Sequence, residues 1–589
     1  MEAITVPLGR LKWGFIPVRR IVDEGPEYEE KREIGEAESL QDSSFESLSS
    51  PSTAESGPLE YRDEANRPWW KFFDEYEYRQ NKFTRQAHKV WQWFDGNDTA
   101  ADRKLMWKID ILLTFYAFMA YWVKYLDQTN LNNAYVSPHF ADDLGMVKND
   151  LVNTQVLFNI GNIVFCIPFI YVLYACPLNY VLPALDLCWS VLTIGTSQIN
   201  NVKQLKVLRF FIGAFEAPSY MAYQYLFGTF ISNPGMIARR SMFYYMGQYL
   251  GIMTSGLLSG AIVDNLEGVH GYHAWRWIFI VDGCISLAVG IIGFYMIPGT
   301  PTDCYSIWFT DDEIRLLRRR LKENHVAGRP DPKQAILNLF GWKMWKEILT
   351  SWEIYALSVF NFFCWNCNNV TSGSYNLWLK SLNRYNPGEL QYKTALTPGL
   401  GFVWIFLVSM FADLFHCRWG AVVWSQLINV SGNVILSVWN LDERGKWYAF
   451  CVSFFAWAAA PTLYSWQNDI CRRDAQKRAV VLVWMNMFAQ ASTAWMAVIV
   501  WKTEEAPQFP KGFPWTAANA FMFGVWAIVI LALYKHQEKK YARQNGIVIY
   551  NSKTGPVPDG APEAVGAKDG TPTSFSSSKV HLEIESTSS

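Results

Sequence analysis

Apolar runs of about 20 residues recur along the middle of this chain, separated by short charged or Pro/Gly-rich breaks. At a rise of about 1.5 Å per residue, a helix of that length matches the hydrocarbon core of a bilayer, about 30 Å thick. The pattern therefore predicts twelve transmembrane helices. Their expected bounds are Ile109 to Asp127, Asn153 to Leu173, Tyr180 to Ile199, Val207 to Ile231, Met242 to Val263, Trp277 to Ile297, Ile354 to Leu377, Ala395 to Phe411, Trp419 to Trp439, Trp447 to Trp466, Ala479 to Trp501 and Trp515 to Tyr534.

A long polar stretch divides these spans into two sets of six, which predicts an all-α integral membrane protein with two six-helix halves. The units are an N-terminal region 1–108, a first half 109–297, a connecting loop 298–352, a second half 353–534 and a tail 535–589. Residues 23–57 are acidic and Ser-rich and are expected, like most of the tail, to be disordered. Residues 60–94 mix aromatic and charged side chains. They are expected to lie along the membrane surface or to dock on the bundle, as an ordered cap more simply than as a functional unit.

The connecting loop contains FTDDEIRLLRRRLKEN, which predicts an amphipathic helix. Thr310 and Glu313 have the spacing of a capping box, and apolar residues follow at helical intervals with three arginines between them. Further Lys and Arg residues gather in the other loops on this side and after the last span. By the positive-inside rule this side, with both termini, is cytoplasmic.

Composition narrows the class of protein. The chain is 50% hydrophobic with a net charge of −1, and no basic patch accompanies a nucleic-acid motif, so a nucleic-acid partner is not expected. The sequence contains no phosphate-binding GxxxxGK[ST] loop, zinc-ligand spacing or nucleophile elbow. Neither an enzyme nor a bound cofactor or metal is therefore expected, and the lipid bilayer is the partner that composition itself predicts.

Four local strings are more specific: YLDQTNLNNAYVS, RFFIGAFEAP, GVHGYHAWRWIFIVDG and IPGTPTDCYSIWFTDDE. Together they resemble the fungal anion:cation symporter branch of the major facilitator superfamily, which includes allantoate, pantothenate and biotin permeases. The likeness runs from about Tyr61 to Asn551. It implies the major facilitator fold and a monomeric permease of the plasma membrane that imports a small polar organic solute by proton symport.

Two questions stay open at this point. Neutral amides in the spans favour an amino-acid-like, dipeptide or ureido cargo, whereas a vitamin carboxylate such as pantothenate or biotin is the alternative. A nutrient sensor on a transporter fold, signalling through the long N-terminal segment, is the alternative to a transporter.

The chain departs from the family pattern in two places. Gln128 stands where many members have an arginine, so a fixed cation for an anionic cargo is missing there. The loop YACPLNY between the second and third spans lacks the usual charges. The corresponding loop of the second half keeps Asp413 and Arg418, which are expected to pair or to cap helix ends at a cytoplasmic gate.

Ionisable side chains inside spans are costly, so each is a candidate for function. Arg209 and Glu216 lie two turns apart on one face of the fourth span, about 10.5 Å along its axis, which is too far for direct pairing. Burial favours a neutral carboxyl and a nearby cation favours a carboxylate, so Glu216 is expected to couple transport to a proton. A structural hydrogen bond is the alternative. A similarly spaced pair in the related animal organic-anion transporters implies the coupling role.

Lys124 and Asp127 are two further charged candidates for coupling and translocation. They lie three residues apart at the predicted outer end of the first span. That spacing favours the structural interpretation, in which the two side chains pair with each other.

Neutral amides dominate the other polar positions. NFFCWNCNNVTSGSYNLW in the seventh span predicts an interrupted helix that lines a polar path. Amides suit a zwitterion, amide or ureido group because they both donate and accept hydrogen bonds. The alternative for any single amide side chain is a structural hydrogen bond that holds two helices together, worth about 0.6 kcal/mol. The residues expected to line the substrate cavity are Gln128, Asn130, Tyr220, Gln224, Gln248, Asn366, Asn369, Gln467, Asn468, Asn486 and Gln490.

Small residues share one face of the fifth span, at Gly247, Gly251, Gly256 and Gly260. They predict close approach to another helix and not a binding site.

Overall fold

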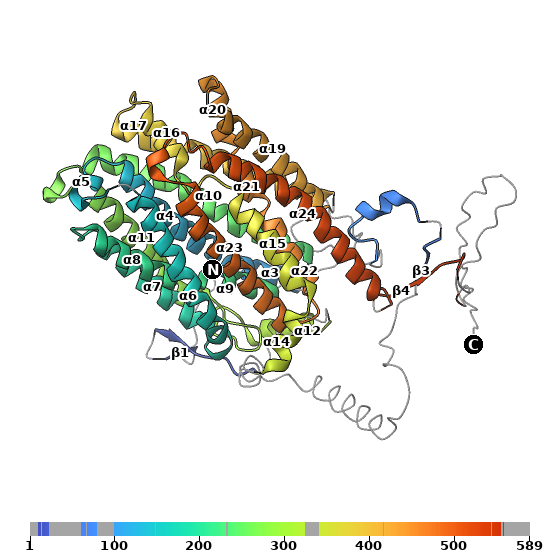
Figure 1. The fold of residues 1–589 in the computed structure, drawn as a ribbon. Helices are drawn as coiled ribbons and strands as arrows, with labels where there is room; N and C mark the ends of the chain where they lie inside the picture. Colours follow the sequence, from blue (N-terminus) through green and yellow to red (C-terminus); the bar gives the residue numbers. More distant parts are fainter. Residues whose placement is uncertain are drawn as a thin grey trace, which may run out of the picture.

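Helices make up almost all of the described protein and form one bundle (Figure 1). The computed structural model describes residues 10–12, 15–22, 60–65, 67–78, 99–147, 149–230, 234–323, 341–415, 417–543, 545–554 and 558. The stretch 23–57, most of the tail and the part of the aromatic segment from residue 79 to residue 94 lie outside the described residues.

The first half follows the predicted order of six spans. Helix α3 (Ala100–Ile109), the π-helical turn η3 (Asp110–Phe115) and α4 (Tyr116–Val136) form the first span, and the short helix α5 (Phe140–Leu144) forms a corner after it. The other spans are α6 (Asp150–Ala175), α7 (Leu178–Thr196), α8 (Val202–Glu216) with α9 (Ser219–Phe230), α10 (Pro234–Leu266) and α11 (Ala274–Met296).

The second half has more interruptions. Its spans are α15 (Trp352–Asn366) with α16 (Ser374–Ser381), α18 (Leu396–Leu414), α19 (Arg418–Val438), α20 (Glu443–Val452) with α21 (Phe455–Ala458) and α22 (Ala460–Ile470), α23 (Ala475–Val500) and α24 (Gly512–Lys540). The short helix α17 (Pro387–Thr394) precedes α18.

These elements confirm the predicted fold class of twelve spans in two halves. Among the described residues, seven helices are long and apolar enough to cross a membrane by length and composition alone. The first span differs from its predicted bounds, since it runs from Ala100 to Val136. It continues past Asp127 because Asn130 and Asn133, polar residues that suggested a loop, point into the bundle and are buried.

Helix α10 approaches both halves closely through its glycines. A Cβ atom on Gly247 would lie 2.5 Å from the carbonyl oxygen of Phe118, and one on Gly251 would lie 2.5 Å from that of Trp122, both in α4. Where α10 faces α17, a Cβ atom would lie 2.5 Å from the Thr394 side chain at Gly256 and 2.7 Å from the Tyr392 ring at Gly260. The predicted close approach is confirmed, and it joins α10 to its own half and to the other.

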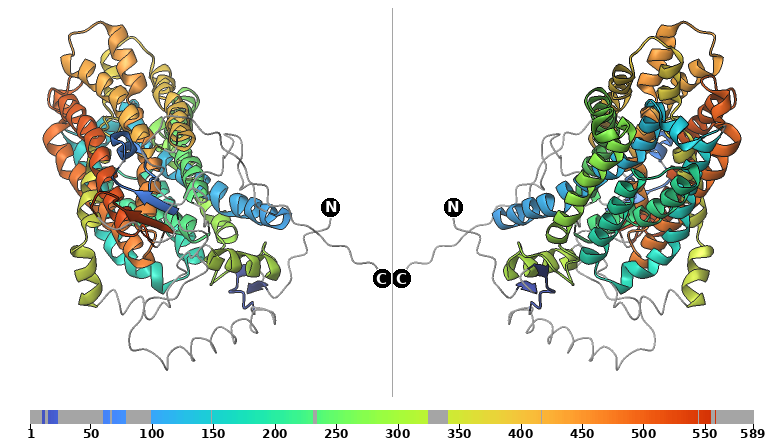
Figure 2. Two further views of the ribbon diagram at one scale, coloured as in Figure 1. Left: turned by 90° about the vertical axis from the view of Figure 1, so that its right-hand side faces the viewer. Right: turned by 90° about the vertical axis from the view of Figure 1, so that its left-hand side faces the viewer.

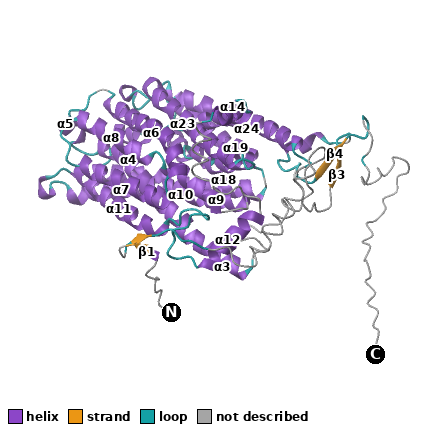
Figure 3. Ribbon diagram, turned by 90° about the horizontal axis from the view of Figure 1, so that it is seen from below, coloured by secondary structure: helices purple, strands orange, loops and turns teal. Residues whose placement is uncertain are grey.

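The two ends of the bundle differ. Helices α5 and α17 lie at one end, here called the distal end, whereas the strands and α12 (Asp311–Glu323) lie toward the other, here called the terminal end (Figures 1 and 3). Helix α12 begins with the predicted capping box: the Thr310 N–H donates to the Glu313 carboxylate at 2.9 Å, and the Glu313 N–H donates to Thr310 Oγ1 at 3.3 Å. Helix α14 (Trp342–Leu349) leads into the second half.

Residues 10–22 dock at the terminal end, on the first half, where the Tyr180 hydroxyl donates to the Pro17 carbonyl, and on the connecting loop. Strands β1 (Leu11–Lys12) and β2 (Ile16–Pro17) form an antiparallel hairpin. The Arg10 guanidinium donates to the carbonyl of Ile307 at 2.7 Å. The Arg318 side chain of α12 donates to the carbonyl of Val22 at 3.0 Å.

Segments from near the two ends of the chain meet on the second half. Strand β3 (Glu60–Asp63) pairs in parallel with β4 (Ile547–Tyr550), and the two lie side by side in Figure 2. The 3-10 helix η2 (Trp69–Phe73) follows, with the rings of Phe73 and Trp419 5.1 Å apart. We call residues 60–78 together with 545–552 the terminal clamp. Of the two expectations for the aromatic segment, docking on the bundle is confirmed for residues 60–78.

Candidate functional site

A cavity lies between the two halves in the distal part of the bundle. Its walls come from α4, α6, the start of α18, the end of α23 and the break between α15 and α16. This break, at residues 367–373, confirms the interrupted helix of the seventh span. Three predicted cavity residues line it, namely Gln128, Asn366 and Asn369.

The lining combines neutral polar groups with aromatic rings. Amides and hydroxyls come from both halves, and the rings include Tyr125, Trp365 and Trp457. Among the described lining residues, Arg209 is the only charged one. Its Nε and Nη2 atoms are buried and have no hydrogen-bond partner within the described chain. The cavity lining therefore includes one buried guanidinium with unsatisfied donors among uncharged groups.

Arg209 and Glu216 of α8 each face an oppositely charged residue of α4. The Arg209 guanidinium lies 3.6 Å from the Asp127 carboxylate, and Lys124 Nζ lies 3.9 Å from the Glu216 carboxylate. The expected pairing of Lys124 with Asp127 is therefore wrong. Both lie mid-helix, because α4 extends to Val136, and their side chains reach across to α8 instead of along α4.

Hydrogen bonds extend this network to α7, α10 and α11. The Gln128 side-chain amide donates to the Glu216 carboxylate at 3.0 Å, and the Thr193 hydroxyl donates to Asp127 at 3.1 Å. Asn130 donates to the carboxylate of Asp282 in α11 and accepts from Ser255 in α10 at 3.0 Å.

The buried charges of this network do not balance. We call Lys124, Asp127, Arg209, Glu216 and Asp282 the charge network, and each residue is at most 6% exposed. It contains two cations and three carboxyls. An unpaired buried charge is costly, and a proton on one of the three carboxyls would leave these five groups electrically neutral. The arrangement can therefore hold a proton beside the cavity.

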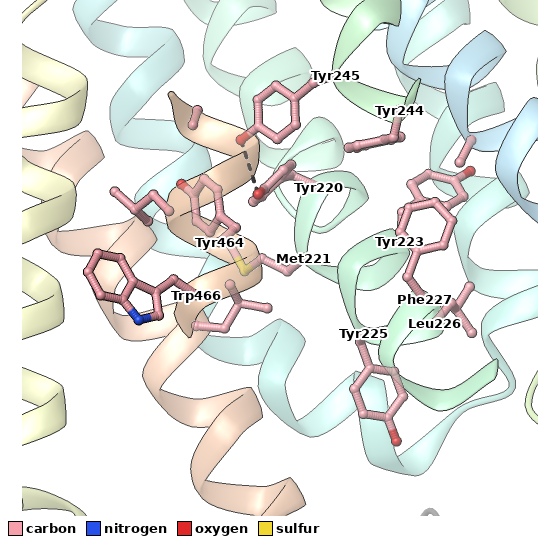
Figure 4. Packing of buried hydrophobic residues seen from close by; sticks show 14 of the residues in the cluster. Tyr220, Met221, Tyr223, Tyr225, Leu226, Phe227, Tyr244, Tyr245, Tyr464 and Trp466 are labelled. Carbon is pink, nitrogen blue, oxygen red and sulfur yellow. Dashed lines mark hydrogen bonds between the residues drawn. The ribbon is translucent and has the colours of Figure 1, made fainter. Parts of the chain in front are cut away.

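Tyrosines close the cavity toward the terminal end. Tyr121 lies one turn before Tyr125 in α4 and stacks on Tyr244 with 4.2 Å between the ring centroids. The Tyr245 hydroxyl donates to Tyr220 at 3.0 Å (Figure 4). Tyr464, from α22 of the second half, lies 4.9 Å from the ring of Tyr220. This tyrosine cluster, residues 121, 220, 244, 245 and 464, spans both halves.

Charged pairs hold the halves and the clamp at the terminal end. Arg239 of α10 lies 3.3 Å from Asp413 of α18, so this pair bridges the two halves. Arg418 instead lies 2.9 Å from Asp469 and 3.2 Å from Glu75 of the terminal clamp. The two predicted gate residues thus have different partners: Asp413 holds the first half and Arg418 holds the clamp.

The other predicted cavity residues lie outside this lining. Asn130 donates to Asp282 of the charge network, Tyr220 belongs to the tyrosine cluster, and Gln248 lines a smaller cavity beside that cluster. Gln224 accepts from Ser241 at 3.2 Å. Four more are buried in α22 and α23: Gln467, Asn468, Asn486 and Gln490.

Several lining residues were missed by sequence reasoning. Thr129 and Asn132 follow Tyr125 and Gln128 on one face of α4, at spacings of three, four and seven residues, and Gln155 and Asn159 lie four apart in α6. This helical periodicity of polar residues was a usable indication. No sequence pattern indicated the tryptophans of the distal cavity walls, because aromatic residues are frequent throughout the chain.

Comparison with known proteins agrees with this geometry. Residues 117–497 match the model of the Major Facilitator Superfamily. A vitamin H transporter of Saccharomyces cerevisiae is 39% identical over 502 residues, covering 85% of this chain and 84% of that protein. A pantothenate transporter of Schizosaccharomyces pombe is 30% identical over 418 residues, covering 70% of this chain and 78% of that protein. The solved structure of the proton:xylose symporter XylE bound to 6-bromo-6-deoxy-D-glucose shares the fold, with a TM-score of 0.51 at 13% identity, and covers 72% of this chain and 95% of that one.

Proposed function

Because the chain belongs to the major facilitator superfamily of membrane transporters, we propose that it imports a small organic acid bearing an amide or ureido group, together with protons, across the plasma membrane. Arg209 is the observation that carries this proposal. It is a buried cation with unsatisfied donors in a cavity otherwise lined by neutral groups. A guanidinium is suited to bind a carboxylate.

The proposed cargo follows from the whole lining. A carboxylate would satisfy the free guanidinium donors of Arg209, while the amides of Asn366 and Asn369 suit a neutral amide or ureido group. Biotin and pantothenate each combine one carboxylate with such a group, and relatives of this chain are named for them. A dipeptide or other amino-acid-like cargo would add an ammonium group, for which no lining carboxylate is found among the described residues.

Uptake in cells tests this function. Cells that lack their own biotin and pantothenate transporters should accumulate labelled biotin or pantothenate in a saturable way when they express the intact chain. Arg209→Gln should reduce this uptake at least about tenfold, because a charge-assisted hydrogen bond of about 1.5–3 kcal/mol is lost. Initial rates at fixed surface expression are the measurement.

Lys206→Gln provides the matched control. Lys206 lies in the same helix and pairs with Asp150 at 2.7 Å, outside the cavity lining, so this variant should keep wild-type uptake. If neither labelled acid accumulates although the chain reaches the cell surface, the proposed cargo is wrong. Saturable binding without accumulation would support a sensor instead.

We further propose that the terminal end faces the cytoplasm. Basic residues gather at this end, among them Arg239, Arg472 and Lys539, as the positive-inside rule requires. An epitope placed after residue 554 should bind antibody only in permeabilised cells. Labelling of intact cells would reverse the orientation.

A further inference from the structure

Three side chains with metal-binding chemistry meet at the distal end of the first half. His139 lies in the corner between α4 and α5, Glu267 directly follows α10, and His273 directly precedes α11. One nitrogen of each imidazole and one carboxylate oxygen of Glu267 all lie within 4.8 Å of one another. The two imidazole rings are stacked, with 4.5 Å between their centroids.

The contacts of His273 fix the orientation of its imidazole ring relative to the two neighbouring carboxylates. Its Nδ1 lies 2.9 Å from Glu267 Oε1, so the Nδ1 edge of the ring points toward the other two side chains of the group. Its Nε2 faces the other way, 3.8 Å from Asp143 Oδ2. Trp275 Nε1 donates to the same Asp143 oxygen at 2.8 Å and holds that carboxylate in place. Glu267 is fixed in turn, because its second oxygen accepts from the Ala274 N–H at 2.7 Å.

This arrangement has the parts of a metal centre. Two imidazoles and a carboxylate are a donor set for zinc and neighbouring transition metals, with a fourth position left for water. Zinc–nitrogen and zinc–oxygen distances of about 2.0–2.1 Å place neighbouring donor atoms about 3.3 Å apart in a tetrahedron, so the two stacked imidazole rings would turn toward each other's edges on binding. Asp143 lies 3.8 Å from the other nitrogen of His273, where a modest shift would let its carboxylate orient the ligating ring.

We propose that His139, Glu267 and His273 bind a divalent transition-metal ion such as Zn²⁺. The sequence pattern predicts no metal, because His139 is far along the chain from the other two residues. The ion would tie the α4–α5 corner to the connection between α10 and α11. His139 and Glu267 are exposed, so the ion can enter directly from solution.

Cobalt binding to the purified full-length protein tests the site. Co²⁺ substitutes for Zn²⁺ and gives visible absorption bands when a protein coordinates it at four positions. The intact chain, freed of any polyhistidine tag, should bind one equivalent of Co²⁺ saturably and release it to Zn²⁺. His139→Ala and His273→Ala should each weaken binding at least about tenfold.

His270→Ala is the matched control. His270 lies in the same connection as His273 and is exposed, but it is outside the cluster and packs by Trp277, so its loss should leave Co²⁺ binding unchanged. Glu267→Gln keeps the side-chain shape and should also weaken binding, which separates loss of a ligand from misfolding. Absence of a saturable cobalt spectrum in the intact chain, or unchanged affinity in His139→Ala/His273→Ala, would overturn the proposal.

Discussion

Glu216 lies at the point where the charge network meets the cavity lining. Its Oε2 accepts from Gln128, whereas its buried Oε1 has no hydrogen-bond partner within the described chain. Gln128 also lines the cavity. A proton at this free oxygen would therefore be one side chain away from a bound solute, close enough for solute and proton to influence each other.

We expect Glu216→Gln to uncouple transport from the proton gradient. The amide cannot gain or lose a proton, but it keeps the side-chain shape and the contact with Gln128. Accumulation against a gradient should therefore lose its dependence on external pH, while exchange of labelled for unlabelled solute across the membrane continues. Both are measured in cells or proteoliposomes at several external pH values.

Glu353→Gln is the control for this variant. Glu353 is also buried, and it pairs with Lys477 at 2.8 Å in the second half, away from the charge network. It should keep the pH dependence of accumulation. If Glu216→Gln keeps it as well, Glu216 is not the coupling residue.

Sequence reasoning at the residue scale found the charged side chains but not their partners. Arg209 and Glu216 stood out because charges inside apolar runs are rare. Their partners, Asp127 and Lys124, depend on how α4 is rotated against α8, and spacing along one helix contains no information about that rotation. The same limit applies to Asp413 and Arg418, whose partners come from α10, α22 and the terminal clamp.

At the scale of elements, α10 depends on small residues for its place in the bundle. We expect Gly247→Ala to destabilise the protein by about 1–3 kcal/mol, because a methyl group would overlap the Phe118 carbonyl, which is backbone and cannot rotate away. A lower thermal unfolding midpoint of the purified protein is the measurement.

Gly195→Ala is the control, because it makes the same substitution at a helix position where no neighbouring atom crowds the added methyl group. Gly195 lies in α7 and a Cβ atom there has no described neighbour within 4 Å, so this variant should be as stable as the wild type or slightly more stable. Equal midpoints for Gly247→Ala and Gly195→Ala would show that the close approach of α10 to α4 does not matter for stability.

Element positions were largely predictable, and element ends were less so. Apolar length located all twelve spans, because a helix that crosses lipid must satisfy its backbone internally. The C-terminal end of α4 was placed too early, because its buried asparagines are residues that are typical of loops. The NNVTSG stretch of the seventh span was recognised as an interruption because it clusters polar and small residues where an unbroken span would be apolar.

At the scale of the whole molecule, the N-terminal region holds both halves. Residues 10–22 dock on the first half, and residues 60–78 dock on the second. Glu77 is central to the second attachment, since Arg67 donates to it at 2.6 and 2.7 Å and Lys535 pairs with it. Burial raises the pKa of Glu77, but the hydrogen bonds from Arg67 and Lys535 outweigh burial and hold it below its ordinary value of 4.5.

Acid should therefore release the terminal clamp. A carboxyl whose pKa is lowered by folding stabilises the docked state above its ordinary pKa, and this stability is lost as the pH falls through the lowered value. We expect residues 60–78 to lose hydrogen-exchange protection below pH 4.5, with rates corrected for the intrinsic pH dependence. Glu77→Gln should show weaker protection already at neutral pH. Protection that is independent of both pH and Glu77 would contradict this account.

The pairing of β3 with β4 also determines when the clamp can form. A ribosome makes β3 before any transmembrane span, and it makes β4 after all twelve. During synthesis the backbone of β3 stays unpaired until almost the entire chain has been made. A nascent or truncated chain that stops before Ile547 has no partner strand for β3. The terminal clamp can therefore be completed only after the chain has been synthesised as far as β4.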